Sequence, residues 1–182
     1  YMAQFIPLAV SETKQLAKER ILPAEDVKPY KNRVPLYDLT AAAGNSEEVQ
    51  IVENFEWSQL PDRSTPADDL FACRIVGESM NSVIPNGSIC LFRKYHGGSR
   101  GGKIMLVQLS NFSDPDTGAA FSVKEYWSRK VVSEDGYNHR EIILKPRSES
   151  DDYQEIIVTP AMAEEMKVLA EFEMVLGVSN SK

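Results

Sequence analysis

Beyond residue 60 the chain is dominated by short runs of β-branched, aromatic and other apolar residues, separated by glycine-containing turns. Short apolar runs bounded by turn residues are typical of strands rather than helices. Many short strands connected in this way favour a mainly β domain built from twisted, partly closed sheets. The pattern predicts strands at residues 71–76, 88–92, 103–109, 121–127, 141–144, 155–158 and 170–178.

Two segments interrupt the strand pattern with helical signals. Thr159 followed by Pro160 reads as an N-cap and a first helical position, and predicts a short helix in the C-terminal region that runs to about Leu169. Residues 11–20 begin with a serine and are mostly polar, which predicts a second short helix followed by a proline-containing linker. The N-terminal part of the chain is therefore expected to form an extended arm.

The composition is that of an ordinary globular protein, with 182 residues, 42% of them hydrophobic and 26% charged. No apolar run approaches the roughly 20 residues of a membrane helix, and no secretory signal is visible, so we expect a cytoplasmic protein without a membrane association. Cys73 and Cys90 lie in apolar runs and are interpreted as reduced core residues, with a disulfide as the less favoured alternative. Two cysteines and two histidines at these spacings predict neither a metal site nor a cofactor.

The net charge of −7 argues against direct binding of DNA, because phosphate neutralisation by basic residues supplies much of the affinity of DNA-binding domains. Residues 1–30 carry equal numbers of acidic and basic side chains and are too few for a helix-turn-helix domain. We therefore expect no direct DNA binding by this chain.

The strongest candidate for chemistry is Ser79, within the sequence Gly77-Glu78-Ser79-Met80. A serine hydroxyl becomes a useful nucleophile only when a base takes its proton. The histidines, His96 and His139, both lie in polar, turn-like settings. A lysine can serve instead when burial lowers its pKa, and Lys124 lies in an apolar strand-like run.

Each of these residues also has an ordinary structural interpretation. Ser79 could cap a short helix, an interpretation compatible with catalysis because a helix start supplies N–H donors for an oxyanion. Lys124 shares a strand face with Ser122 and Tyr126, and most strand lysines face solvent. Other lysines that could act as the base are Lys103, Lys130 and Lys145.

Two further segments leave alternatives open. The small residues of the segment from Thr40 to Gly44 would suit a narrow protease cleft, but equally a loop or a helical turn. Asp114 and Asp116 are interpreted as part of a solvated turn, because a calcium loop would need many more oxygen ligands in register.

Taken together, Ala43-Gly44, Gly77-Glu78-Ser79-Met80 with a following Pro85-Asn86-Gly87 turn, and Val123-Lys124 resemble the LexA/UmuD-type self-cleaving serine peptidase domain. The resemblance covers roughly residues 34–176. The order and approximate spacing of the motifs match, and the combination is far more specific than the short serine motif alone. A segment that looks like an insertion, residues 113–118, lengthens the interval from serine to lysine relative to compact family members.

The resemblance implies a leader at 1–33 and a peptidase domain at 34–178, the latter divided into a cleavage-site segment at 34–60 and a catalytic core at 61–178. It implies that Ser79 attacks the Ala43–Gly44 bond of its own chain, that Lys124 is the base, and that the backbone N–H groups of Glu78 and Ser79 bind the oxyanion. It further implies a homodimer and cleavage promoted by a RecA-type filament.

Two alternatives to self-cleavage remain. The lead-in at 37–39 and the region 127–146 also look similar to LexA-like domains appended to bacterial helicases in genome-defence proteins. The chain could then be a non-cleaving dimerisation or partner-docking module fused to a helicase domain of a larger DNA-acting protein. The second alternative, an enzyme similar to signal peptidases that acts on other proteins, is disfavoured because no membrane anchor is visible.

Overall fold

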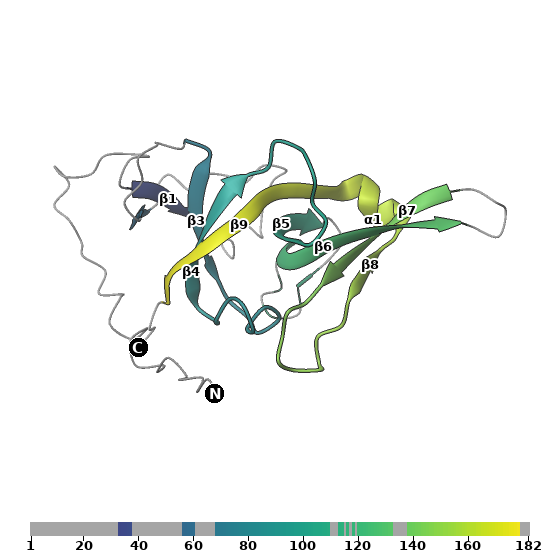
Figure 1. Ribbon diagram of the computed structural model, residues 1–182. Coiled ribbons are helices and arrows are strands. Elements are labelled where there is room, and N and C mark those ends of the chain that lie inside the picture. Colours follow the sequence, from purple (N-terminus) through teal and green to yellow (C-terminus); the bar gives the residue numbers. More distant parts are fainter. Residues whose placement is uncertain are drawn as a thin grey trace, which may run out of the picture.

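The computed structural model describes residues 33–37, 56–60, 68–109, 113–114, 116, 118, 120–132 and 138–178, and all structural statements below concern these residues (Figure 1). The predicted helix at 11–20 and the cleavage bond Ala43–Gly44 lie outside them, as do most of the predicted leader and cleavage-site segment.

The described strands form one nine-stranded sheet in the order β2-β1-β3-β4-β9-β5-β6-β7-β8, with β2 and β8 at its two ends. Every pairing is antiparallel except the parallel pairing of β1 with β3. The prediction of a mainly β fold is confirmed. The strands are β1 Arg33–Tyr37, β2 Glu56–Gln59, β3 Leu70–Ile75, β4 Ser88–Lys94, β5 Lys103–Leu109, β6 Phe121–Val132, β7 Asn138–Lys145, β8 Ile156–Val158 and β9 Met166–Val178.

The apolar runs correctly predicted the core parts of the strands, but they did not predict the polar strand segments. The predicted strand at 103–109 coincides with β5, whereas β6 and β7 continue beyond the apolar runs into polar residues. The two extensions pair with each other, from Lys130 with Arg140 to Val132 with Asn138. β2 was not predicted, because Glu56–Gln59 lacks an alternating pattern and forms a strand by pairing with β1.

The single helix of the described residues, α1, spans Pro160–Glu165 and begins as predicted, with the Thr159 side chain accepting a hydrogen bond from the Met162 N–H at 3.3 Å. Its predicted end at Leu169 is wrong, because the chain turns into β9 at Met166. Met166 pairs with Leu109 and Val168 with Val107 of β5. Strand pairing and burial against β5 therefore override the helical propensity of this segment.

The long strand β9 links two parts of the sheet. Its first half pairs with β5 and its second half with β4, and both pairings contain register shifts. Figure 1 shows β9 running across the molecule, with β1, β3 and β4 toward one end and β5 to β8 toward the other. Register shifts like those in the two pairings of β9 increase the bend and twist of a sheet.

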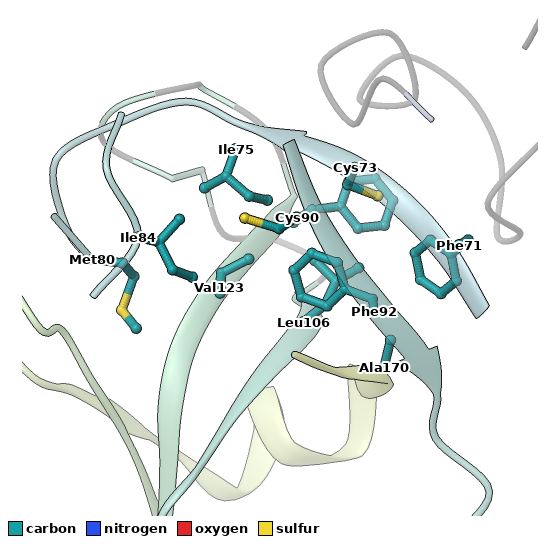
Figure 2. Packing of buried hydrophobic residues seen from close by; sticks show 11 residues of the cluster. Phe71, Cys73, Ile75, Met80, Ile84, Cys90, Phe92, Leu106, Val123 and Ala170 are labelled. Carbon is teal, nitrogen blue, oxygen red and sulfur yellow. The ribbon is translucent and has the colours of Figure 1, made fainter. Parts of the chain in front are cut away.

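This curvature determines where the candidate site forms. Three strands separate β3 from β6, so in a flat sheet the two would lie roughly 19 Å apart. Instead, Ile75 of β3 and Val123 of β6 belong to one buried hydrophobic cluster (Figure 2). The sheet therefore curls around this cluster and brings the end of β3 to the start of β6.

Cys73 and Cys90 are direct cross-strand partners in the same cluster, and both are buried core residues, as predicted. Burial raises the pKa of the Cys90 thiol to about 12, which keeps it protonated and unreactive. Within the described residues, none of the helical structure has the length and apolar character that a membrane crossing requires.

Candidate active site

Ser79 lies in a turn, residues 77–87, that connects β3 to β4 and is held at both ends by hydrogen bonds. The Gly87 N–H donates to the Ile75 carbonyl at 2.8 Å, and the Gly77 N–H donates to Asn86 Oδ1 at 3.0 Å. Gly77 has a φ of +115°, a conformation that L side chains rarely adopt. The glycine of the serine motif is therefore required by the geometry of the turn.

The turn is also anchored by two buried side chains and by a hydrogen bond from a distant segment. Met80 and Ile84 are buried in the cluster that contains Val123 of β6, as Figure 2 shows. The carbonyl of Ser79 accepts a hydrogen bond from the Arg147 N–H at 2.9 Å. These contacts fix the backbone on both sides of the serine. Met80 thus packs beside the nucleophile candidate, as predicted.

The interpretation of Ser79 as a helix cap is wrong, because residues 77–84 form consecutive turns and no helix begins there. A helix dipole consequently contributes nothing at this position. The Ser79 hydroxyl instead lies 2.8 Å from Nζ of Lys124.

Lys124 does not face solvent. It is only 4% exposed, and its Nζ donates to Ser122 Oγ at 2.8 Å and to the Val123 carbonyl at 3.2 Å. Ser122, Lys124 and Tyr126 alternate along β6 as predicted, and all three are buried. Ser79 and Lys124 are 45 residues apart in the sequence, and the curvature of the sheet brings their side chains into contact.

The electrostatics of Lys124 combine two opposing influences. Burial lowers the pKa of its ammonium group below the ordinary value of lysine, and the carboxylates of Asp114 and Asp116 act in the opposite direction. Asp114 Oδ2 lies 3.6 Å from Nζ. Because burial is the larger effect, the neutral amine forms at a lower pH than in an exposed lysine.

The other lysines considered as bases are in ion pairs or on the surface. Lys103 forms an ion pair with Glu171 at 2.8 Å, and Lys145 forms one with Glu155 at 2.9 Å. Lys130 lies on the exposed part of β6. Among the strand lysines named from the sequence, Lys124 is the one whose amine lies against the serine.

The interpretation of Asp114 as part of a solvated turn is wrong. Asp114 is 6% exposed and its Oδ2 accepts a hydrogen bond from Ser122 Oγ at 2.7 Å. Because Ser122 also binds Lys124, a continuous set of polar contacts runs from Asp114 to Ser79. This contact could not be predicted from the sequence, since the aspartate lies in a segment typical of an exposed loop.

Asp116 is exposed but is not a free surface carboxylate. Its Oδ2 accepts from the Glu78 N–H at 3.1 Å, and its Oδ1 accepts from the Tyr153 hydroxyl at 2.6 Å. The Tyr153 contact raises the pKa of that phenol to about 12. A side chain at Gly77 would collide with the Asp116 carboxylate, so the close approach depends on glycine there.

The structure therefore brings together three of the predicted site residues, Glu78, Ser79 and Lys124. The predicted cleavage bond Ala43–Gly44 lies outside the described residues. No group of three or more His, Cys, Asp or Glu side chains in the described part of the chain is arranged to hold a metal ion.

Chemically, the arrangement is a hydroxyl in contact with a buried amine whose pKa is lowered. An amine of this kind can accept a proton from the hydroxyl at a lower pH than the amine of an exposed lysine. Sequence reasoning missed the supporting residues Asp114, Asp116 and Tyr153, and assigned no role to Ser122. For Ser122 a signal existed, because a hydroxyl two positions from a strand lysine lies on the same face.

A comparison with known families agrees with the motifs. A family model described as Peptidase S24-like matches residues 35–172, which include Ser79 and Lys124. Among proteins of curated function, none matches this sequence. The match covers most of the chain, and so this chain belongs to the Peptidase S24-like family of LexA/UmuD-type serine peptidases.

Proposed function

We propose that this chain is a serine peptidase that cleaves its own Ala43–Gly44 bond, with Ser79 as the nucleophile and Lys124 as the general base. The observation that carries the proposal is the 2.8 Å contact between Ser79 Oγ and a Lys124 amine that is only 4% exposed. A nucleophile and a base within hydrogen-bonding distance are the minimal requirement for this chemistry.

In the first step, neutral Lys124 takes the proton of the Ser79 hydroxyl while Oγ attacks the carbonyl carbon of Ala43. The carbonyl oxygen then carries a negative charge, which the backbone N–H groups of Glu78 and Ser79 would stabilise. Because the substrate is part of the same chain, attack benefits from a high effective concentration.

In the second step, the tetrahedral intermediate collapses, the bond between Ala43 and Gly44 breaks, and Lys124 returns its proton to the leaving amine of Gly44. An ester between Ala43 and Ser79 remains. Water then attacks this ester, Lys124 accepts one proton of the water, and the Ser79 hydroxyl is regenerated.

The oxyanion role requires a change at Glu78, because its N–H now donates to Asp116 Oδ2 at 3.1 Å. The substrate carbonyl would have to replace the carboxylate as the acceptor. Hydrogen bonds at Gly77, Gly87 and Arg147 hold the backbone of the turn that presents the Glu78 N–H.

Intact-mass spectrometry of the purified chain over a pH series tests the proposal. We expect a single split into fragments 1–43 and 44–182 that becomes faster as the pH rises. The Ser79→Ala protein is the matched control and should stay intact. A split that persists in Ser79→Ala, or no split at any pH, would contradict the proposal.

The second candidate function is a non-cleaving dimerisation or partner-docking module of a larger helicase-type protein. The contact between the Glu78 N–H and Asp116 favours it, because an internal carboxylate already occupies the proposed oxyanion donor. The same mass series discriminates the candidates, since a docking module remains intact at every pH while retaining a folded domain.

The biological setting belongs to the proposal as well. A regulatory switch in a DNA-damage or genome-defence context would use a homodimer, a RecA-type filament or a fused helicase domain as partner, in the cytoplasm. Direct DNA binding is not part of the proposal, given the net charge of −7. Fluorescence anisotropy with a labelled duplex at about 0.15 M salt checks this last point.

A further inference from the structure

We propose that Asp114 is a positioning residue that directs the lone pair of Lys124 toward Ser79 by fixing the proton of the Ser122 hydroxyl. The inference rests on the proposed function and adds a residue from the 113–118 loop, which the family motifs do not include. It is carried by the contacts of Asp114, Ser122 and Lys124 within the buried part of the site.

A serine hydroxyl has one proton to donate and two lone pairs that can accept. Ser122 Oγ lies 2.7 Å from Asp114 Oδ2, and an ionised carboxylate can only accept, so the Ser122 proton points at Asp114. Ser122 Oγ can then act only as an acceptor toward Lys124 Nζ, 2.8 Å away.

A neutral amine has two N–H donors and one lone pair. In this site the donors have two acceptors, Ser122 Oγ at 2.8 Å and the Val123 carbonyl at 3.2 Å. The remaining direction of the tetrahedral nitrogen faces Ser79 Oγ at 2.8 Å. If the Ser122 hydroxyl donated a hydrogen bond to Lys124 Nζ instead, the lone pair of the amine would accept that bond. It would then not be available to receive the proton of Ser79.

Asp114 is itself held in place. Its Oδ1 accepts from the Asp116 N–H at 3.1 Å, and its carbonyl accepts from the Gly118 N–H at 2.7 Å. At 6% exposure its carboxylate is shielded from water, so its interaction with the amine is screened only weakly. The loop therefore presents a fixed charge behind the Ser122 hydroxyl.

Two carboxylates act on the charge of Lys124. They are those of Asp114 and Asp116, and both favour the ammonium form. In the neighbouring turn, the Glu78 carboxylate accepts from Asn81 Nδ2 and Asn86 Nδ2. On β5 the residue opposite Lys124 is the uncharged Met105.

The test measures self-cleavage against pH for the full chain and for Asp114→Asn, Ser122→Ala and the double variant. An asparagine can donate to Ser122, which frees the Ser122 proton to point at Lys124. We expect Asp114→Asn to lower the plateau rate at alkaline pH by roughly 10- to 100-fold, and to move the midpoint of the profile to lower pH. In the Ser122→Ala background the same change should lower the plateau no further.

Two controls separate the outcomes. Asp68→Asn changes an exposed carboxylate and should leave both the plateau and the midpoint unchanged. The titration of Lys124, followed by NMR in the Ser79→Ala protein, should also move to lower pH in Asp114→Asn, whether or not cleavage occurs. If the unaltered chain cleaves itself and the Asp114→Asn protein has the same plateau rate, the positioning role of Asp114 is wrong while the proposed function stands. No cleavage in any variant overturns the proposed function.

A different observation carries a second inference: the structure assigns Asp116 the role of an internal competitor of the substrate. Its Oδ2 accepts from the Glu78 N–H at 3.1 Å, which is the interaction proposed for the oxyanion. The Tyr153 hydroxyl donates to Oδ1 at 2.6 Å and holds the carboxylate in this position. A carboxylate oxygen on an oxyanion donor resembles the charged oxygen of the intermediate, so it opposes productive binding of the cleavage segment.

Asp116→Ala tests this inference through the plateau rate at alkaline pH, where Lys124 is neutral and its pKa no longer affects the rate. We expect the plateau to rise several-fold, and Tyr153→Phe to raise it to a smaller extent. Asp151→Ala, a change at an exposed carboxylate, should leave it unchanged. A plateau rate that falls or stays constant in Asp116→Ala overturns the competitor role. The pKa of Tyr153 should fall from about 12 in this variant, and this change shows that Asp116 and Tyr153 were in contact.

Discussion

Lys103 and Lys124 lie diagonally across the neighbouring strands β5 and β6, yet their surroundings differ completely. The register pairs Lys103 with Tyr126, which shares a strand face with Lys124. The Lys103 side chain is 42% exposed and paired with Glu171, whereas that of Lys124 is 5% exposed and lies against Ser79. Strand position alone therefore does not make a lysine a candidate base.

The difference arises from what covers each lysine. The amine of Lys124 lies against Ser79 of the turn and 3.6 Å from Asp114 Oδ2, and the residue is almost entirely removed from water. Lys103 instead forms an ion pair with a carboxylate of β9, Glu171, at 2.8 Å, and its side chain remains partly exposed to water. Two segments that are distant in sequence thus convert one strand lysine into a candidate base.

The largest expected effect tests this contrast directly. Lys124→Ala should slow the split at Ala43–Gly44 by about 10²- to 10⁴-fold, the usual contribution of a positioned general base. Lys103→Ala removes a lysine from the neighbouring strand and should leave the rate unchanged. Intact-mass time courses at one alkaline pH give both numbers. Normal cleavage by Lys124→Ala would transfer the role of base to another group.

The pH dependence sharpens the comparison. The base acts only as the neutral amine, so the rate should rise about tenfold per pH unit below the pKa of Lys124 and level off above it. Because burial lowers that pKa, levelling should occur at a lower pH than about 10.4, the value for an exposed lysine. A profile that is still rising above that pH would mean that the base is not a buried lysine.

A smaller effect concerns stability. It compares the free energy of unfolding that is lost when the buried anchor of the turn is removed with that lost when the surface ion pair is removed. Met80 is 2% exposed, so Met80→Ala should lower the free energy of unfolding by about 2–5 kcal/mol and also slow cleavage through the loosened turn. Lys103→Ala breaks a partly exposed ion pair and should cost only about 0–1 kcal/mol. Urea denaturation of both variants provides the measurement. Equal losses would show that the turn is not anchored through Met80.

Local pattern was sufficient to locate most strands of the core, the start of α1 at Thr159, and the strand face of Lys124. These features depend on neighbouring residues, whose alternation and capping chemistry are visible in the sequence. The end of α1 and the strand β2 were missed, because both depend on pairing with strands that are distant in sequence.

The sequence by itself also determined the reactive residue types and their order, since the glycine, serine and lysine motifs point to the family that matches residues 35–172. Only the tertiary structure decided which groups surround them. The buried contact of Asp114 with Ser122 and the contact of Asp116 with the Glu78 N–H arise because the sheet curls and these two aspartates lie against the strand and the turn of the site. Burial and electrostatic interactions depend on distances in space, and a loop that reads as polar and exposed contains no information about what it covers.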